Sequence, residues 1–396
     1  MSWEKKTLDQ LGSVSRGKSK HRPRNDPKLF GGQYPFIQTA DVKNANFYIT
    51  EYSDTYNEAG LAQSKLWDIG TLCITIAANI ADTGILGIPA CFPDSIMGFT
   101  SYDGISDVRF VKYCFDMLQR DCKQISQGTA QDNLSWQKLS TIEFPAPPIQ
   151  TQRRIADILS AYDDLIENNR KQIKLLEEAA QRLYKEWFVD LRFPGHEHTK
   201  IVDGVPEGWS MGILDDIVKE TGESTKKENK QEYAYYLPID CLPQKSIGYI
   251  DTNDIKLAKS SLVSFDKGDI IFGAMRPYFH KVVVARDKGI TRSTCFVLNS
   301  RSASMWGYVA MLLFNTVTVE YATQISVGTT MPYVRWKDMK LMPSLIPNKQ
   351  IAISFDNLVK PMIEKVGLLA NQIRALAQAR DCLLPKLMSG EVEMQL

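Results

Sequence analysis

The feature that most constrains the fold is an internal repeat. Five segments of the first half of the chain return in the same order in the second half, at a spacing of about 200 residues. Such a period is far too long for a solenoid, so the repeated unit is a domain followed by a helix. The matching segments are Leu8–Ser19 with Leu214–Ser224, Asp68–Leu72 with Asp266–Ile270, Ser126–Trp136 with Ser326–Trp336, Pro148 and Gln152 with Pro347 and Gln350, and the helical patterns that follow these prolines.

Both halves end in a long helical pattern. The apolar positions advance by alternating steps of four and three residues, which is typical of the heptad seam of a coiled coil. A helix of about 40 residues would be roughly 60 Å long. The predicted seam consists of Ile155, Leu159, Tyr162, Ile166, Asn169, Ile173, Leu176, Ala180, Leu183 and Trp187 in the first helix, and Val359, Ile363, Val366, Ala370, Ile373, Ala377, Leu384 and Leu387 in the second.

Two helices with matching seams most simply pack on each other, in antiparallel fashion if a pseudo-twofold axis relates the repeats. The alternative is that each helix packs on its own globular domain, but a narrow seam favours a helix partner. Asn169 occupies a seam position, where a polar residue fixes register unless it points to solvent at a frayed crossing. Arg380 interrupts the second seam. Pro361 predicts a first turn or a kink, so that the regular part of the second helix begins there.

Outside the helices the sequence predicts two α+β domains of about 140 residues each. Short apolar runs at 72–76, 270–273 and 282–285 predict strands, and the patterns at 107–122 and 305–318 predict helices. The predicted parts of the chain are a first domain at 1–147, a first helical spacer at 148–192, a second domain at 193–346 with an entry linker at 193–208, and a second helical spacer at 347–396.

Composition excludes several classes of protein. The chain has 396 residues, of which 44% are hydrophobic and 23% charged, as in an ordinary folded protein. Its net charge of +1 does not indicate any class of partner. A surface that binds nucleic acid must therefore be a local concentration of positive charge. The seven cysteines include no CxxC pair, which argues against a disulfide framework or a thiolate zinc site. We recognise neither a signal peptide nor a membrane span, and therefore expect a cytoplasmic protein without a membrane partner.

One motif suggests nucleotide binding. Gly12–Ser19 is a literal match to the phosphate-binding loop GxxxxGK[ST]. That loop needs a strand before it and a helix after it, whereas residues 4–11 are polar and helix-like, and Pro23 and Pro27 oppose a helix downstream. The second copy has Glu223 in place of the lysine. A P-loop nucleotide hydrolase is therefore a minor alternative.

No other catalytic or metal-binding pattern stands out. His196–Glu197–His198 has no third ligand nearby and is interpreted as a solvated linker. The chain contains neither a methyltransferase NPPY-type tetrapeptide nor a glycine-rich cofactor loop after a strand. We therefore predict no catalytic residue and no metal site.

A series of cations at alternate positions points to nucleic acid. In an extended chain such residues lie on one side, about 6.6 Å apart, and can follow a phosphate backbone. The alternative is a solvated basic loop. The candidate DNA-binding residues are Arg16, Lys18, Lys20, Arg22 and Arg24 of this series with Ser19, the weaker set Lys226, Lys227 and Lys230 of the second copy, and the cluster of Arg276, Tyr278 and Lys281.

The order of the parts and three strings of sequence carry a family resemblance. The order is a globular unit, a long helix headed by PPxxxQ, a second globular unit and a long helix headed by PxxQ. The strings are FPAPPIQTQRRIADILSAYDDLIENNRKQIKLLEEAAQRLYKEWFVDLRFPG, VPEGW at Val205 and LLPKLMSGEV near the C-terminus. In these features the whole chain resembles the DNA-specificity subunits of Type I restriction–modification enzymes. The globular units match the family only in scattered framework positions.

The resemblance implies a function. Each globular unit looks like a target-recognition domain that binds one half of a split double-stranded DNA site, with the helices setting the gap. The fold class is then two similar α+β domains separated by two long helices packed as an antiparallel coiled coil, in a pseudo-twofold repeat. The implied subunit is not an enzyme and binds no cofactor. Two modification subunits with S-adenosylmethionine, and restriction/translocase subunits with ATP and Mg, dock on it, and the modified base is usually adenine. A freestanding coiled-coil DNA-binding adaptor is the remaining alternative.

Overall fold

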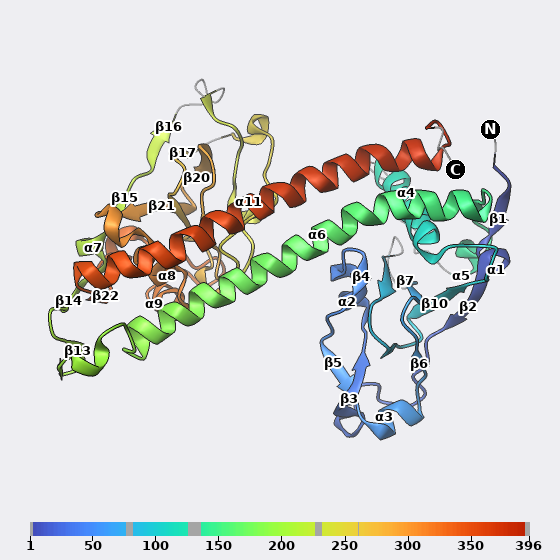
Figure 1. The fold of residues 1–396 in the computed structure, drawn as a ribbon, viewed down its shortest axis with the longest axis horizontal. Helices are drawn as coiled ribbons and strands as arrows, with labels where there is room; N and C mark the ends of the chain where they lie inside the picture. The colour runs from blue at the N-terminus through green and yellow to red at the C-terminus, as the bar shows by residue number, and fades with distance from the viewer. Residues whose placement is uncertain (1–2, 77–81, 126–135, 226–231, 260, 393–396) are drawn as a thin grey trace. The chain divides into compact units, whose positions relative to one another are not determined.

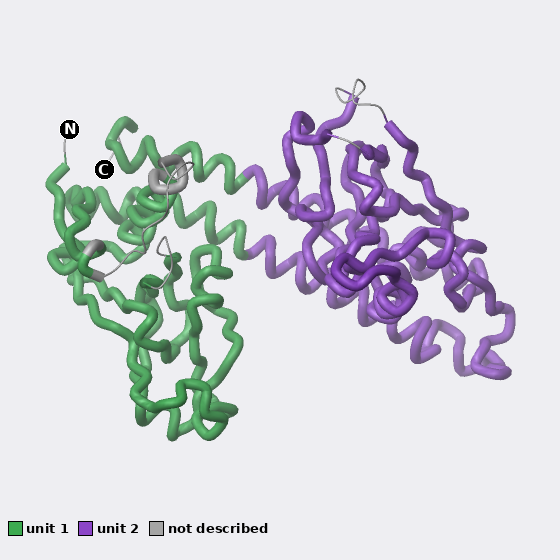
Figure 2. The backbone as a smooth tube through the Cα atoms, turned by 180° about the vertical axis from the view of Figure 1, so that it is seen from behind, with its two compact units in different colours: residues 1–167, 376–396 green, residues 168–375 purple. Residues whose placement is uncertain are grey.

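The chain forms two compact units, which Figure 2 shows in different colours. The computed structural model describes residues 3–76, 82–125, 136–225, 232–259 and 261–392. Unit 1 consists of residues 1–167 and 376–396, and unit 2 of residues 168–375. Each unit therefore contains one globular domain together with part of both long helices.

Unit 1 is built on two sheets and one separate pair of strands. Its strands are β1 (Lys5–Thr7), β2 (Gly12–Arg16), β3 (Phe30–Phe36), β4 (Tyr48–Ile49), β5 (Asp54–Tyr56), β6 (Leu66–Trp67), β7 (Leu72–Thr75), β8 (Thr83–Leu86), β9 (Ala90–Cys91), β10 (Ile96–Ser101) and β11 (Glu143–Pro145). The sheets have the orders β2-β10-β7-β8-β4 and β5-β3-β9-β6 (Figure 1), and β1 pairs with β11. The pairs β4–β8 and β3–β9 are parallel, and the others are antiparallel.

One core joins the longest helix of the first domain and both long helices to the larger sheet of unit 1. The helices of the first domain are α1 (Leu8–Leu11), η1 (Pro27–Leu29), α2 (Thr39–Asn44), α3 (Glu58–Ala62), α4 (Val108–Ile125) and α5 (Trp136–Leu139). Phe110 of α4 and Ile74 of β7 belong to the same buried cluster as Ile155 and Leu384 of the long helices. The first domain therefore packs against both long helices, which are part of its core.

Unit 2 has antiparallel sheets throughout its described residues. Its strands are β12 (Ile201–Val202), β13 (Val205–Pro206), β14 (Ser210–Ile213), β15 (Val218–Glu220), β16 (Glu223–Thr225), β17 (Leu262–Phe265), β18 (Ile270–Gly273), β19 (Val282–Val284), β20 (Gly289–Arg292), β21 (Cys295–Ser300) and β22 (Pro343–Ile346). They form the sheets β15-β21-β18-β19 and β16-β17-β20 and the pairs β12–β13 and β14–β22. The short helices are η3 (His196–His198), α7 (Leu214–Ile217), η5 (Ile239–Cys241), η6 (Ile255–Leu257), η7 (Pro277–Phe279), η8 (Ala303–Met305), α8 (Trp306–Phe314), α9 (Thr316–Gln324) and α10 (Trp336–Met339).

The two units share a topology, as the internal repeat predicts. The order β2-β10-β7-β8 in unit 1 corresponds to β15-β21-β18-β19 in unit 2, and unit 1 adds β4. In each unit a four-residue helix, α1 or α7, leads directly into the first of these strands. Another short helix, α5 or α10, precedes the strand that pairs back to the start of the domain. The predicted α+β repeat is confirmed, although residues 126–135 of one echo lie outside the described residues.

Most elements predicted from local patterns are confirmed. β7, β18 and β19 occupy the three apolar runs, and α4 occupies the first helical pattern. The second pattern contains two helices, α8 and α9, instead of one. The break occurs at Asn315, whose Oδ1 accepts a hydrogen bond from the N–H of Val317 at 2.9 Å and so caps α9.

The two long helices are α6 (Ile149–Tyr184), which continues in a π-helical turn η2 (Lys185–Val189), and α11 (Lys349–Met388). All the residues predicted for the helix pair are buried or half-buried in these helices. They also contact the domains, because Ile173 and Val359 pack in one core with Ile270 and Leu298. The helices therefore pack on each other and on the domains, so the two alternatives are both realised. Within the described residues, no helix is long and apolar enough to span a membrane.

In unit 1 the helices meet around a buried ion pair. A guanidinium nitrogen of Arg380 donates to Asp163, which is 1% exposed, and the hydroxyl of Tyr113 in α4 donates to the same carboxylate at 2.5 Å. Burial raises the pKa of Asp163, and the charge of Arg380 opposes this shift. Arg380, which interrupts the apolar seam, is thus the charged partner of the buried Asp163.

In unit 2 the helices meet through an amide pair and an aromatic cluster. The Nδ2 of Asn169 donates to the Oε1 of Gln372 at 3.3 Å, so Asn169 faces the other helix and not solvent. Farther along, the rings of Tyr184 and Phe355 lie 6.3 Å apart. Because the contacted residue number in α11 falls as the number in α6 rises, the two helices are antiparallel.

A buried carboxylate ties the second domain to α6. Glu177 is 9% exposed, and its Oε1 accepts hydrogen bonds from the Ser246 hydroxyl at 2.7 Å and from the N–H groups of Ile247 at 2.8 Å and Gly248 at 3.2 Å. Burial raises the pKa of Glu177, while these hydrogen bonds act in the opposite direction. The loop 246–248 is thereby held against the helix.

The predicted start of the second helix is wrong. α11 begins at Lys349, well before Pro361, and runs through that residue. Proline removes one backbone donor from a helix, but the adjacent seam residues Val359 and Ile363 are 0% and 4% exposed. Burial of the seam therefore outweighs the local penalty of the proline.

Candidate nucleic-acid interface

The basic loop, defined here as residues 16–24, follows β2 in unit 1. Arg16, Lys18 and Lys20 are exposed, whereas Gly17 and Ser19 between them are buried. The backbone is fixed to the domain, because the N–H of Gly17 donates to the Ile96 carbonyl at 2.8 Å and that of Lys18 to the Phe92 carbonyl at 3.0 Å. Within the described ranges none of the three cations has an ion-pair partner. The alternation therefore places three free cations on one side, as predicted.

The alternation ends at Lys20. Arg24 lies 2.6 Å from a carboxylate oxygen of Asp94, and Arg22 lies 3.8 Å from the other oxygen. Arg22 also donates to the carbonyl of Ser19 at 2.7 Å. The prediction of five cations along one extended side is thus wrong for the last two, because Asp94 draws both guanidinium groups out of the row.

Ser19 does not belong to the exposed surface. It is 6% exposed, and its side chain lies on the inner side of the same alternating segment. Ser19 instead lines a hollow beside the loop. Ser19 is therefore not part of the exposed row, because of the period-two geometry that exposes its neighbours, and its contact with DNA stays a prediction.

The structure contradicts the P-loop alternative. The segment Gly12–Arg16 is itself a strand, and it follows a helix instead of preceding one. The next helical element after Ser19 is the three-residue turn η1. No helix N-terminus is therefore available to bind phosphate at this segment, and a P-loop nucleotide hydrolase is excluded.

The predicted DNA-binding residues of unit 2 differ in their exposure to solvent. Lys226, Lys227 and Lys230 lie outside the described residues. Lys281 is half-buried, and its Nζ donates to the Ile239 carbonyl at 2.7 Å. Of the predicted cluster, only Tyr278 is well exposed, at 50%.

Arg276 connects Tyr278 to a second loop. The N–H of Arg276 donates to the Pro332 carbonyl at 2.7 Å, and Met275 pairs with Tyr333 across an isolated bridge. The φ of Arg276 is +49°, a conformation that costs about 1–3 kcal/mol for a residue other than glycine and is common at functional sites. The loops 275–281 and 326–333 therefore form one surface.

We call this surface the aromatic surface, and part of it was not predicted from the sequence. Val327, Met331 and Tyr333 are 47%, 55% and 47% exposed beside Tyr278. Exposed aromatic rings can stack on nucleic-acid bases, and apolar side chains can pack between base steps. The only signal in the sequence was that residues 326–336 repeat a segment of the first half.

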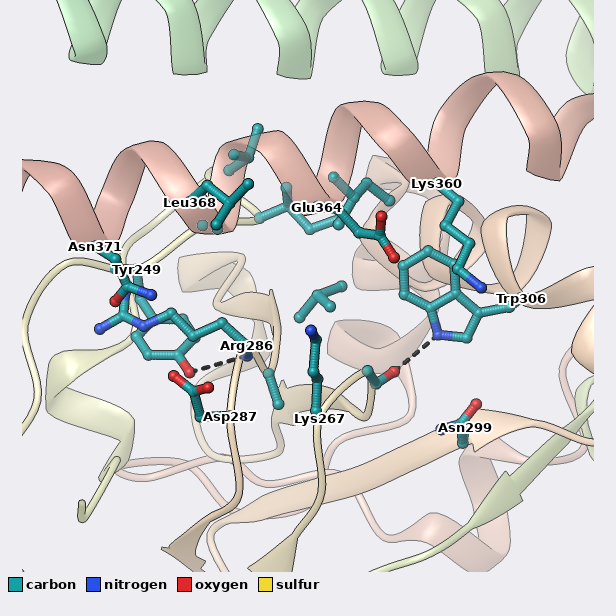
Figure 3. A pocket seen from close by; sticks show the side chains of 18 residues that line it. Tyr249, Lys267, Arg286, Asp287, Asn299, Trp306, Lys360, Glu364, Leu368 and Asn371 are labelled. Carbon is teal, nitrogen blue, oxygen red and sulfur yellow. Dashed lines mark hydrogen bonds between the residues drawn. The ribbon is translucent and has the colours of Figure 1, made fainter. Parts of the chain in front are cut away.

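A hollow of about 540 Å³ lies in unit 2 between α11 and the domain (Figure 3). Lys267 and Lys360 project into it with Glu364 between them, while Arg286 stacks 4.3 Å from the ring centroid of Tyr249. Because carboxylates accompany these cations, the hollow is a weaker phosphate-binding surface than the basic loop. Among the described residues no group of three or more His, Cys, Asp or Glu side chains could hold a metal ion.

Comparison with known proteins agrees with this geometry. A family model described as a Type I restriction modification DNA specificity domain matches residues 1–178. The Type I restriction enzyme MjaIX specificity subunit of Methanocaldococcus jannaschii is 27% identical over 414 residues, covering 99% of this chain and 94% of the relative. The EcoDI specificity subunit of Escherichia coli is 20% identical over 431 residues, covering 100% and 90%.

A solved structure shows the same fold. The S subunit of a Type I restriction–modification system from M. genitalium has a TM-score of 0.63 at 16% identity, covering 100% of this chain and 97% of that one. This likeness supports the fold of two repeated α+β domains on a shared pair of helices. Residues 1–178 thus match the DNA specificity domain of this family, and the whole chain is similar to DNA-specificity subunits of Type I restriction–modification enzymes.

Proposed function

We propose that this chain recognises a DNA site in two separated parts, one part for each unit, and that modification and restriction subunits assemble around it. The observation that carries the proposal is the repeated topology on a shared antiparallel helix pair. Half-sites about one DNA turn apart, roughly 34–36 Å, suit two domains on helices of roughly 60 Å. The gap between the half-sites is then set by the length of the helices.

The same proposal assigns the chemistry to the partners. This chain has a recognition and scaffolding role without catalysis, while methyl transfer, DNA translocation and cleavage belong to subunits that bind S-adenosylmethionine, ATP and Mg. The family supports this division of roles. DNA would be bound through the basic loop of unit 1 and the aromatic surface of unit 2, where exposed cations and rings are found.

Lengthening both helices tests the role of the helix pair. One heptad inserted after Asn168 in α6 and one before Leu376 in α11 adds about 10 Å to each helix, or roughly three base pairs. We expect the methylated motif in cells to keep both half-sites and to gain about three unspecified base pairs between them. Methylome sequencing measures this directly. An unchanged gap contradicts the proposal.

Removing the exposed cations of the basic loop tests the DNA contact. Replacing Arg16, Lys18 and Lys20 by Ala in the assembled complex should weaken binding to all sequences, and flatten the plot of log K against log salt by about 0.9 for each lost phosphate contact. The control replaces three exposed lysines of unit 2 that lie outside both candidate surfaces: Lys200, Lys219 and Lys349. Equal salt slopes for the basic-loop variant and the wild type would show that the loop does not touch DNA.

A further inference from the structure

A hollow in unit 1 opens next to the end of the basic loop. Its volume is about 430 Å³, larger than that of the hollows a single water fills and within the range of ligand sites. Polar side chains and aromatic rings share its wall. The lining residues are Ser19, Arg24, Asn25, Pro27, Phe30, Phe36, Gln38, Thr39, Asp54, Pro93 and Ser95.

Two side chains in the hollow are held in a fixed arrangement. The Nε2 of Gln38 donates to the Oδ2 of Asp54 at 2.5 Å. Gln38 is also fixed through its backbone, because its N–H donates to Asp41 at 2.7 Å at the start of α2. Asp54 lies directly opposite Phe36 in the β3–β5 ladder. An amide and a carboxylate thus stand side by side on ordered elements.

The aromatic residues of the hollow supply an apolar wall. The ring of Phe36, which is 6% exposed, stacks on Tyr56 at 4.0 Å, and Phe30 meets Phe36 edge-on at 5.9 Å. Flat apolar walls beside a few oriented polar groups are the usual surroundings of a bound base. The hollow therefore has both features needed to hold part of a nucleobase.

The polar groups favour one kind of base. A carboxylate only accepts hydrogen bonds, and the oxygen of a glutamine amide also accepts, while the amide NH₂ of Gln38 keeps one hydrogen beyond the one given to Asp54. Adenine and cytosine present an amino group that donates, whereas guanine O6 and thymine O4 present acceptors that a carboxylate repels. Glutamine pairs with adenine and acidic side chains with cytosine for this reason.

We propose that Gln38 and Asp54 determine specificity by receiving the amino-bearing edge of one base, adenine or cytosine, in the half-site bound by unit 1. This inference rests on the proposed function. The adjacent Lys18 and Lys20, which are exposed, would meet the phosphates beside that base. Asp94, which pairs with Arg24, fixes the rim of the hollow.

The test measures base preference in the assembled complex. The complex with its modification subunits is incubated with a pool of duplexes randomised across the motif, and bound DNA is sequenced. Asp54→Asn replaces an acceptor by an amide that also donates, so we expect the preference for an amino base at one position to fall by roughly 5- to 150-fold. Gln38→Ala provides a second variant at an exposed side chain.

Matched controls separate this effect from a general loss of binding. Gln33→Ala changes an exposed glutamine of strand β3 that does not line the hollow, and Asp103→Asn changes a fully exposed aspartate of unit 1. Positions bound by unit 2 must also stay unchanged. If the Asp54→Asn and Gln38→Ala complexes both selected the wild-type motif, the role of these two residues in base preference would be overturned. The proposed function would remain intact. A wild-type complex without any sequence preference would instead overturn the proposed function itself.

Discussion

The two units hold the same pair of helices by different means. Unit 1 places a buried ion pair, Arg380 with Asp163, where the helices meet, and adds a hydroxyl from Tyr113. Unit 2 uses rings around Phe355 and the captured carboxylate of Glu177. Duplication has therefore kept the topology of the domain, while each copy has its own attachment to the helices. The comparison predicts that the units differ in how they respond to substitution and to pH.

The largest effect is expected in the aromatic cluster of unit 2. Phe355 has no exposed surface and lies 4.8 Å from Phe188 and 5.6 Å from Trp187, measured between ring centroids. Phe355→Ala should lower the free energy of unfolding by about 3–5 kcal/mol, because it leaves a large cavity. Hydrogen exchange followed by mass spectrometry should show the lost protection mainly in unit 2. Leu358→Ala, at a position 45% exposed on the same helix, serves as the control. Equal loss of protection in both units would remove the distinction between them.

The next effect is expected at the ion pair of unit 1. Arg380→Ala leaves the buried Asp163 carboxylate without its charged partner, which should lower the free energy of unfolding by about 3 kcal/mol. The protection lost in hydrogen exchange should lie in α4 and the adjoining ends of the long helices. Adding Asp163→Asn should recover part of the loss, because the uncompensated charge disappears. A double variant no more stable than Arg380→Ala would mean that the pair matters only through its packing.

The smallest effect, and the one most sensitive to pH, is expected at Glu177. Because burial raises its pKa above the ordinary value of 4.5, the folded chain binds more protons than the unfolded chain just above that pH. The contribution of Glu177 to stability should therefore fall as the pH rises from about 4.5 through its folded pKa. Glu177→Gln keeps an acceptor for the loop 246–248 and should remove this pH dependence. Glu177→Ala should lower the free energy of unfolding by about 1–3 kcal/mol.

Urea unfolding at several pH values measures this difference. The exposed neighbour provides the control, since Glu178→Gln should follow the wild-type curve. If Glu177→Gln also followed that curve, the carboxylate would not titrate differently in the folded chain.

The periodic parts of the fold could be predicted from the sequence. Steps of four and three residues identify the helix seam, and repeated segments identify the duplicated domain, because both are local patterns. The exposed positions of Arg16, Lys18 and Lys20 follow in the same way from the period-two geometry of an extended chain. The same geometry should have marked Ser19 as an inward residue.

Contacts between distant segments could not be predicted. Asp94 draws Arg22 and Arg24 out of the row from a position far along the chain, and nothing in the local sequence marks it. Gln38 and Asp54 likewise come together only when β3 and β5 pair. The break of the seam at Arg380 was visible, but its buried partner was not. Single polar residues acquire their role from the tertiary structure.

The division of the long helices between the units has a consequence for synthesis. Leu384 and Leu387 near the end of the chain pack in the core of unit 1 with Ile155 and Leu159. The first domain therefore lacks part of its interior until Leu384 and Leu387 have been synthesised. During that interval its apolar surface stays open to chaperones and to neighbouring nascent chains.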